Sequence, residues 1–482
     1  MVSDDVLYLP IRQLAERIRA RRLSPVELTD AYLARSERIG RRLHAYVTLT
    51  PELARAQARR AEREIAAGHY RGPLHGIPYA AKDLLAVLGY PTTWGARPFA
   101  AQRFDYDAAV IERLNAAGAV LIGKAAMIEL AGGLGYTGPY ASLTGPCHNP
   151  WDVTRWTCGS SSGSGAIASA ALAAFALGSD TRGSIICPSS WCGISGLRPS
   201  FGRVSRHGAM AIAWSMDKIG PMARSADCCA LVLEAIAGHD PRDFDSLPAP
   251  QAAFRWNGGA SGARLRIGRL TNVFPDARPE IHAATDAALR IMERQGAQVA
   301  DAQLPDGPFE EAAELVILIE AASSFSRLID SGRCAQLEDP LGQINGYVSR
   351  LFSAHDLLHI ERLRTVLQRD IDRLFDRFDV LAAPGEGETA SPIGPPPGTT
   401  PLAPRPRSET RPRRRYQYDS KQPDAISSLC GLPALSVPAG LSAERLPINV
   451  QFMGRALRDD LVLEAGRFLQ AHSDFHLHRP PI

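Results

Sequence analysis

The sequence has little net charge of either sign. Its 482 residues include 54 lysines and arginines against 51 aspartates and glutamates, so the formal net charge is only +3. A charge this small gives no electrostatic attraction to nucleic acid or to an anionic membrane surface. Hydrophobic residues make up 45% and charged residues 22% of the chain, as in ordinary globular proteins. The composition therefore predicts a globular protein that binds neither nucleic acid nor membranes.

Long hydrophobic runs are also missing. The first residues, Met1 to Asp5, are acidic and lack the basic start and apolar core of a secretory signal. The longest apolar stretch, Gly165 to Gly178, is too short to span a bilayer. We expect this stretch to form a helix buried inside the protein. Together these features predict a cytoplasmic location.

Cysteine is scarce, with eight residues in the chain and no Cys-x-x-Cys pair. This usage favours reduced thiols in a cytoplasmic protein. Cys187 and Cys192 lie close together, but no nearby histidine or cysteine completes a zinc site. We therefore expect all eight cysteines to act as small buried apolar side chains, and the sequence offers no set of metal ligands.

The first half of the chain has the pattern of an α/β protein. Ser24-Pro25-Val26-Glu27 matches a helix-capping box, and Thr50-Pro51 begins a second helix. From Gly76 onward, short apolar strands at 76–82 and 119–124 enclose a helix at 108–117. Strands that alternate with helices favour an α/β architecture. The glycine-, proline- and serine-rich residues that follow, up to Gly165, predict a long ordered loop.

The second half continues the same pattern without an internal repeat or a clean linker. Strands are expected at 264–268, 297–304, 379–384, 432–438 and 447–454, and helices at 279–294, 354–375 and 459–472. We therefore predict a single large α/β domain with a central mixed β-sheet covered by helices on both sides. In this division, residues 1–70 are N-terminal helices that pack on a core of residues 71–482. A Pro/Arg-rich loop insertion covers 385–415, and its part from Pro392 to Arg415 is expected to be a solvated loop or a lid.

Two segments rich in small residues are candidates for a functional site. They are CGSSSGS at 158–164 and GSDTRGS at 178–184, and an apolar stretch separates them. Glycine and serine disfavour both helices and strands, so one such segment alone would suggest a flexible linker. Two of them around a buried stretch favour a site.

Three short motifs offer weak alternatives. GxSxG at 159–163 would make Ser161 a nucleophile, but residues 154–157 look like a poor strand and no histidine has the required context. SxxK at 215–218 lacks the partner motifs of penicillin-binding enzymes. GxGxxG at 133–138 is followed by prolines where a phosphate-binding helix should begin.

A lysine offers a fourth possibility. A buried lysine loses its charge more easily than an exposed one, and a neutral lysine can activate a serine. Lys82 ends the apolar stretch 77–81, which makes it a candidate. Its neighbour Asp83 offers an ordinary ion pair instead.

Taken together, these segments resemble the amidase-signature family. The likeness runs from about 72 to 242 and resumes at 379–454, and Ser160 and Ser184 are 24 residues apart, as in that family. The segments that carry the resemblance are GPLHGIPYAAKDLLAVLGYPTTWG, NPWDVTRWTCGSSSGSGA, LGSDTRGSIICPSSWCGISGLRPSFGRVSRHG, GLPALSVPAG and LPINVQFMG.

The resemblance implies a catalytic role for three side chains. Ser184 corresponds to the nucleophile, Ser160 to a bridging serine that follows a cis peptide bond and relays the proton, and Lys82 to the general base. The remaining implied residues are the N–H groups of Thr181, Arg182, Gly183 and Ser184, which form an oxyanion hole, and Ser161 and Asp180, which support the site by hydrogen bonds.

Four residues depart from the family pattern. Cys158 and Arg182 stand where glycines are usual, Ile186 replaces a usual arginine, and Arg445 lies in a loop before a late strand. If the glycine before Gly183 needs a positive φ, Arg182 is strained by about 1–2 kcal/mol. Otherwise, its guanidinium points outward or lines the substrate pocket.

The resemblance implies an amidase that hydrolyses a carbon–nitrogen bond of a small-molecule substrate through a Ser184 acyl-enzyme, with no metal or organic cofactor. One alternative is the glutaminase (A) subunit of a tRNA-dependent amidotransferase, which residues 202–224 favour and Ile186 and Cys187 weaken. The other is a hydrolase that prefers esters or carbamates. A heteromeric partner is expected only for the amidotransferase case, and a homodimer is possible in any case. The residues predicted to line the substrate pocket are Tyr136, Trp156, Ile186 and Trp191.

Overall fold

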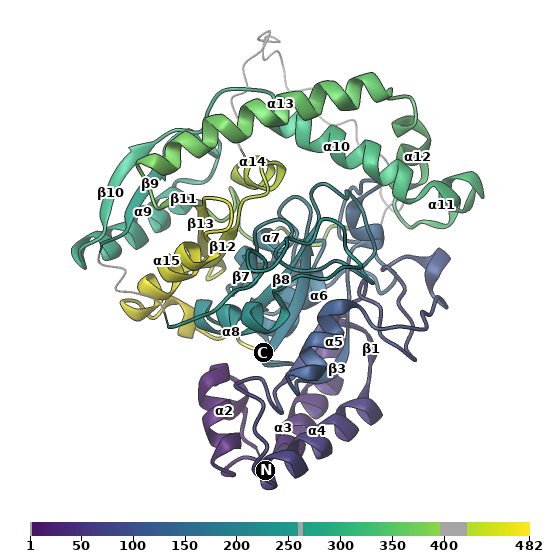
Figure 1. Cartoon of the computed structure of the whole chain (residues 1–482), viewed down its shortest axis with the longest axis vertical. Coiled ribbons are helices and arrows are strands. Elements are labelled where there is room, and N and C mark those ends of the chain that lie inside the picture. The colour runs from purple at the N-terminus through teal and green to yellow at the C-terminus, as the bar shows by residue number, and fades with distance from the viewer. Residues whose placement is uncertain (1, 259–263, 396–421) are drawn as a thin grey trace.

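An 11-stranded mixed sheet forms the centre of the computed structural model, which describes residues 2–258, 264–395 and 422–482 (Figure 1). In sheet order the strands are β1 (Tyr46–Leu49), β3 (Val120–Ala125), β2 (Pro78–Lys82), β6 (Phe175–Asp180), β8 (Lys218–Ala223), β7 (Ser195–Arg198), β12 (Ala434–Leu441), β13 (Pro447–Gly454), β11 (Val380–Pro384), β9 (Arg266–Leu270) and β10 (Gln298–Ala302). Parallel pairs join β3–β2–β6 and β11–β9–β10, and antiparallel pairs join the strands between them. Strands β2, β3, β6 and β8 are buried along their whole length, as expected for strands covered on both faces.

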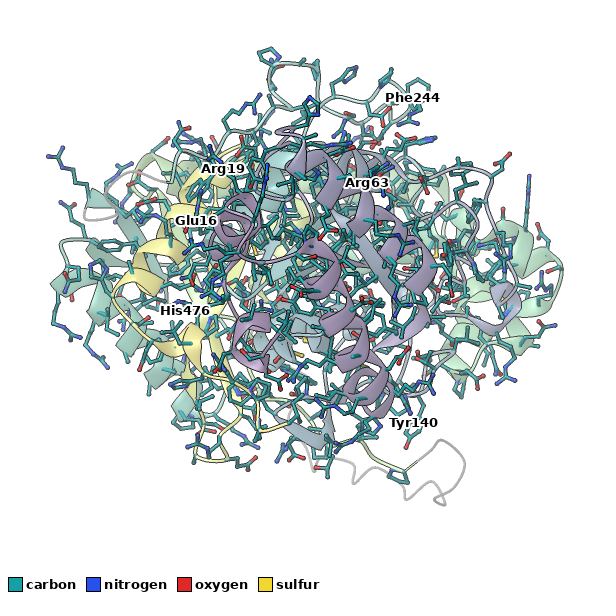
Figure 2. The ribbon with its side chains drawn as sticks, turned by 90° about the horizontal axis from the view of Figure 1, so that it is seen from below. Glu16, Arg19, Arg63, Tyr140, Phe244 and His476 are labelled. Carbon is teal, nitrogen blue, oxygen red and sulfur yellow. A yellow bond between two sulfur atoms is a disulfide. The ribbon has the colours of Figure 1, made fainter. Side chains whose placement is uncertain are left out.

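Four helices at the N-terminus cover one end of the molecule, and Figure 2 shows them from below. They are α1 (Asp4–Leu7), α2 (Ile11–Arg19), α3 (Pro25–Arg35) and α4 (Pro51–Ala66). The Ser24 hydroxyl accepts hydrogen bonds from the N–H groups of Val26 and Glu27 and so caps α3, as the sequence predicts. The same N-terminal segment also contributes β1 to the sheet edge, a strand that the sequence analysis missed.

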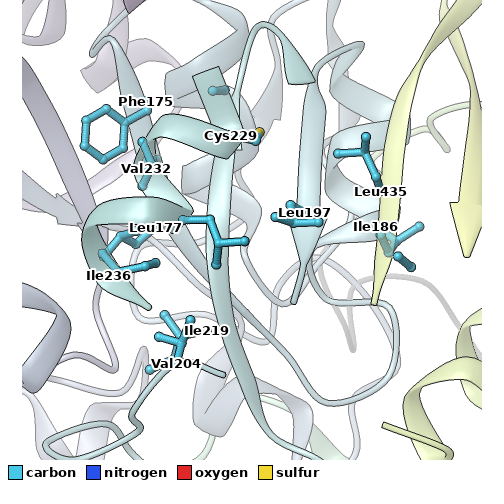
Figure 3. Packing of buried hydrophobic residues seen from close by; sticks show 14 of the residues in the cluster. Phe175, Leu177, Ile186, Leu197, Val204, Ile219, Cys229, Val232, Ile236 and Leu435 are labelled. Atoms are coloured by element: carbon cyan, nitrogen blue, oxygen red, sulfur yellow. The ribbon is translucent and has the colours of Figure 1, made fainter. Parts of the chain in front are cut away.

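Further helices cover both faces of the sheet. Val232 and Ile236 of α8 lie in the same apolar core as Leu177, and Ile186 of α7 lies near Leu435 in that core (Figure 3). The helices nearest the central strands are α5 (Ala109–Ala116), α6 (Ser162–Ser169), α7 (Ile186–Cys192), α8 (Ala226–Ile236), α9 (Pro279–Arg294) and α15 (Asp459–Ala471). This arrangement confirms the predicted α/β fold, with one large mixed sheet between helical layers.

A second group of helices forms an arc beside the sheet (Figure 1). It contains α10 (Phe309–Ser324), α11 (Ser326–Asp330), α12 (Pro340–Ser349), α13 (Ala354–Asp372) and α14 (Pro423–Leu429). A small hairpin, β4 (His148–Asn149) and β5 (Asp152–Trp156), lies outside the main sheet. Short turns of 3-10 or π helix occur at Ser36–Gly40, Arg97–Phe99, Glu129–Gly132, Arg333–Gln336, Arg373–Asp376 and Phe475–Leu477.

Two sequence predictions about secondary structure are wrong. The stretch Gly165 to Gly178 is not one buried helix, because α6 ends at Ser169 and β6 begins at Phe175. A run that is apolar on every side has no periodicity that separates a buried helix from a buried strand. Residues 154–156, judged a poor strand, belong to β5, which pairs with β4.

Part of the predicted Pro/Arg-rich insertion, 396–415, lies outside the described residues. Within the described ranges, no helix is both long enough and apolar enough to cross a membrane.

Candidate active site

Lys82 lies at the C-terminal end of β2, between β3 and β6 in the sheet, and its side chain is fully buried. Its Nζ lies 2.7 Å from Ser160 Oγ, 2.9 Å from Ser161 Oγ and 2.9 Å from Ser179 Oγ. Burial lowers the pKa of Lys82 to about 7, although Asp180 and Asp217 partly oppose this shift. A substantial fraction of Lys82 is therefore neutral near pH 7 and can accept a proton.

The neighbouring carboxylate does not neutralise Lys82. Asp83 forms a buried ion pair with Lys124 on the adjacent strand β3, with 2.8 Å between Oδ1 and Nζ. Asp83 also accepts a hydrogen bond from the Thr93 N–H at 3.0 Å. The sequence suggested an ion pair of Asp83 with Lys82, but in the structure Asp83 pairs with Lys124. Lys82 faces three serine hydroxyl groups.

Ser160 and Ser184 come from two segments that meet beside Lys82. The peptide between Gly159 and Ser160 is cis, as the resemblance implies. The Ser161 N–H donates to the Ser184 carbonyl at 3.3 Å, which holds the two segments together. Ser160 is fully buried, whereas Ser184 is half-buried and lines a cavity. Among the described residues, no hydrogen bond joins the Ser160 and Ser184 hydroxyls.

Asp180 organises the loop that carries Ser184. Its carboxylate accepts hydrogen bonds from the N–H groups of Gly183 and Ile185, each at 2.8 Å, and lies 3.4 Å from the Arg198 guanidinium. Burial alone would raise the pKa of Asp180, but Arg198, Lys218 and these N–H groups outweigh burial and lower it. Asp180 is therefore ionised and positioned to hold the loop.

The same contacts restrict the predicted oxyanion hole. The Gly183 N–H is already donated to Asp180, whereas the N–H groups of Thr181, Arg182 and Ser184 donate to no other described residue. These three groups are the ones available to a substrate oxygen.

The short motifs weighed in the sequence do not supply another nucleophile. Ser161 is fully buried, and its hydroxyl donates to the Ser179 carbonyl at 3.1 Å, so it does not reach a substrate. Ser215 donates to Glu320 and Lys218 donates to Ser428, each at 2.7 Å, so these two residues form no catalytic pair. Two glycines of the 133–138 motif, Gly133 and Gly135, line the cavity, and the next described element after the motif is the strand β4, not a phosphate-binding helix.

The cavity in front of Ser184 has a volume of about 350 Å³. Of the four residues predicted to line the pocket, only Tyr136 does so. Trp156 packs edge-on against the Tyr136 ring, with ring centroids 6.2 Å apart, and Trp191 packs edge-on against Trp156, with centroids 5.8 Å apart. Ile186 lies in the apolar core (Figure 3). The lining residues nearest the two loops are Cys158, Gly159, Thr181, Arg182, Gly183, Ser184 and Cys187.

Arg182 is not strained, because the residue with a positive φ in this loop is Gly183, at 83°. The Arg182 side chain lines the cavity, forms an ion pair with Glu314 at 2.8 Å, and donates to the Gln422 amide oxygen at 2.8 Å. The sequence left two positions open for this guanidinium, pointing outward or lining the substrate pocket. In the structure it lines the pocket.

Cys158 and Cys187 form a disulfide, so the expectation of eight reduced thiols is wrong for these two residues. Their Cα atoms are 6.1 Å apart, within the range that a disulfide spans. The other six cysteines are free and buried, as expected. Sequence spacing could not reveal this bond, because it depends on how the loops before Ser160 and after Ser184 meet.

Sequence reasoning missed the acidic residues of the cavity. The acidic residues that line the cavity are Glu314, Glu386 and Asp424, and the amide side chain of Gln422 lines it as well. The available signal for Glu386 was its place two residues after the predicted strand 379–384, where functional side chains often occur. Within 2–258, 264–395 and 422–482, no group of three or more His, Cys, Asp or Glu side chains is arranged to hold a metal ion.

The chain is similar to known proteins along nearly its whole length. The family model Amidase matches residues 27–463. The A subunit of glutamyl-tRNA(Gln) amidotransferase from Chloroflexus aggregans is 36% identical over 98% of both chains. Among solved structures, native peptide amidase from Stenotrophomonas maltophilia is 30% identical, covers 98% of both chains and has a TM-score of 0.83. A chain of a "vestigial protein complex" linked to the origins of "an s-triazine catabolic enzyme" is 31% identical, with a TM-score of 0.83 and coverage of 96% of this chain and 98% of that one.

Proposed function

The chain belongs to the amidase family, and we propose that it hydrolyses the carbon–nitrogen bond of a small amide through an acyl-enzyme on Ser184. The observation that carries this proposal is the buried contact of 2.7 Å between Lys82 Nζ and Ser160 Oγ, beside a cavity that Ser184 lines. A base of this kind suits acyl transfer, because its pKa of about 7 lies near the operating pH.

In the proposed mechanism, neutral Lys82 accepts the proton of Ser160, and Ser160 accepts the proton of Ser184. The Ser184 oxygen then attacks the amide carbonyl, and the N–H groups of Thr181, Arg182 and Ser184 stabilise the negative charge on the tetrahedral intermediate. The proton returns through Ser160 to the leaving nitrogen. Water repeats these steps on the acyl-enzyme and releases the acid, and no cofactor takes part.

The test compares the purified chain with its Ser184→Ala variant on a panel of aliphatic and aryl amides, anilides, esters and carbamates. We expect amide turnover by the unmodified chain and a loss of several orders of magnitude in the variant. Ser323→Ala is the matched control, because Ser323 is exposed on α10 and its hydroxyl makes no hydrogen bond to another described residue. Turnover that survives in Ser184→Ala would remove the proposed nucleophile, and a preference for esters or carbamates would change the substrate class.

A second candidate is the glutaminase component of a tRNA-dependent amidotransferase. The supporting observation is the 36% identity to the A subunit of the Chloroflexus aggregans enzyme over 98% of both chains. This function would require partner subunits, whereas the first candidate would not. The two are separated by measuring glutamine hydrolysis with and without the remaining subunits and glutamyl-tRNA(Gln). Activity that appears only in the assembled complex favours the second candidate, and hydrolysis of other amides by the chain alone favours the first.

A further inference from the structure

The cavity beside Ser184 is rich in acidic side chains. Glu314, Glu386 and Asp424 line it, and Arg182 is its one basic lining residue among the described parts of the chain. That guanidinium is already engaged, because it pairs with Glu314 and donates to Gln422. Two carboxyl groups, those of Glu386 and Asp424, therefore form no ion pair with any residue that the structure describes.

Asp424 lies in the first turn of α14 and is only 8% exposed. Its Oδ1 atom is buried and has no hydrogen-bond partner among the described residues. The nearby Gln451 amide donates one Nε2 hydrogen bond to the Pro384 carbonyl at 3.0 Å and none to this Oδ1 atom. A buried acceptor without a donor is costly, and a ligand that brings a donor removes that cost.

Asp424 lies next to the loop that carries Ser184. A Cβ atom placed on Gly183 would lie 2.9 Å from Asp424 Oδ2, so this carboxyl group packs against the residue before Ser184. A substrate whose carbonyl carbon sits at Ser184 therefore places its atoms a few bonds farther along near Asp424.

Glu386 follows β11 and is half-buried at the cavity wall, and its side chain makes no hydrogen bond to another described residue. Burial and the nearby Asp424 raise the pKa of Glu386. Burial raises the pKa of Asp424 to about 7, Asp180 adds to this rise, and Arg198, Arg182 and a contact with Gln451 oppose it. Each of these neighbouring carboxyl groups disfavours ionisation of the other. A cation bound next to both favours their ionised forms.

We propose that Asp424 and Glu386 form a subsite for a cationic group of the substrate, so that the preferred substrates are small amides with an ammonium group a few bonds from the scissile carbonyl. An ammonium group supplies up to three donors and one positive charge, which suits two carboxyl groups that form no ion pair with a described residue. This inference rests on the proposed hydrolysis only for the position of the carbonyl, and its binding component is independent of turnover.

The kinetic test uses pairs of amides that differ only by an ammonium group in place of a methyl group. Suitable pairs are glycinamide with propionamide, β-alaninamide with butyramide, and 4-aminobutyramide with pentanamide. For at least one pair, we expect kcat/KM to be ten-fold or more higher for the ammonium amide. Asp424→Asn and Glu386→Gln should each reduce that ratio at least ten-fold, mainly through KM, and leave the neutral amide less affected. Glu388→Gln, on the same loop but exposed and outside the cavity wall, should keep the ratio.

The binding test uses the Ser184→Ala variant, which holds amides without cleaving them. Calorimetry should show at least ten-fold tighter binding of the ammonium member of the preferred pair, and loss of that preference when Asp424→Asn is added. If no amide is hydrolysed but this preference is present, the subsite stands and the proposed hydrolysis fails. Ratios near one in both turnover and binding overturn the subsite, even if neutral amides are hydrolysed well. If the carboxyl variants do not fold, the comparison of each pair in Ser184→Ala alone still decides.

Discussion

Lys82 Nζ lies 2.7 Å from Ser160 Oγ, and both side chains are fully buried. No carboxylate in the described chain forms an ion pair with Lys82, because Asp83 pairs with Lys124 and Asp180 pairs with Arg198. Burial without an ion pair favours the neutral amine. The two lysines on adjacent strands therefore differ in role. The charge of Lys124 is balanced by Asp83, whereas Lys82 has no such partner among the described residues and can act as a proton acceptor.

The first prediction concerns pH. Below pH 7, kcat/KM for an uncharged amide should fall about ten-fold per pH unit, because protonated Lys82 cannot accept a proton and its pKa is about 7. Above that pH the rate should level off. The measurement is a profile from pH 5 to 9 with a substrate that does not titrate. A rate that is constant from pH 5 to 7 would contradict the assignment of Lys82 as the base.

The second prediction ranks the serines. Ser184→Ala should lose nearly all turnover, and Ser160→Ala should lose about 10²–10⁴-fold, the usual contribution of general acid–base catalysis. Ser161→Ala should lose least, because Lys82 keeps its contact of 2.9 Å with Ser179. Single-turnover kinetics with an activated anilide measures the acylation step for each variant. If Ser161→Ala is inactive while Ser184→Ala retains turnover, Ser161 is the nucleophile.

The third prediction concerns the disulfide between Cys158 and Cys187. It links residues that are 29 positions apart, so its loss should reduce the free energy of unfolding by roughly 3–4 kcal/mol. Urea unfolding with and without a thiol reductant measures this difference. The Cys158→Ala/Cys187→Ala double variant is the control, because its stability should no longer respond to the reductant.

Thiol titration of the denatured protein provides an independent check on that bond. We expect six free thiols before reduction, from the six unpaired cysteines, and eight afterwards. Eight thiols before reduction would mean that the bond does not form under those conditions. Because both cysteines line the cavity, reduction should also lower kcat/KM as the two loops loosen.

Most of the fold could be predicted from the sequence because its elements have distinct local signals. The helix Pro279–Arg294 and the strand Pro447–Gly454 match the predicted bounds, since proline begins each one and apolar periodicity continues through it. The stretch Gly165 to Gly178 could not be divided correctly, because alanine and glycine carry little periodic information. The strand that follows α6 is defined only by its pairing with β2 and β8, which are distant in the sequence.

The candidate site was only partly accessible from the sequence. Ser160 and Ser184 lie in segments of unusual composition, whereas Lys82 was assigned as the base through the resemblance to the amidase-signature family, and the structure brings these segments together. Asp424 has no local signal and Glu386 only its place after a predicted strand, because each becomes a cavity residue through the way β11 and α14 pack near Gly183. Contacts between distant segments therefore account for what the sequence analysis missed.

The fourth prediction separates backbone strain from damage to the site by comparing two glycines. Gly183 and Gly68 have similar positive φ values, 83° and 88°, so alanine at either position should cost about 1–2 kcal/mol of stability. A new Cβ on Gly68 meets nothing within 4 Å, whereas one on Gly183 would lie 2.9 Å from Asp424 Oδ2. Gly183→Ala should therefore displace the loop that carries Ser184 and lower kcat by at least ten-fold.

Gly68→Ala should keep the kcat of the unmodified chain, because Gly68 follows α4 and lies outside the cavity wall. Thermal unfolding and steady-state kinetics on both variants provide the comparison. A similar loss of stability with a loss of kcat only in Gly183→Ala would show that turnover depends on the contact between the loop and Asp424. Equal kcat values in the two variants would mean that the loop tolerates this displacement, and that the packing of Asp424 against Gly183 does not control the position of Ser184.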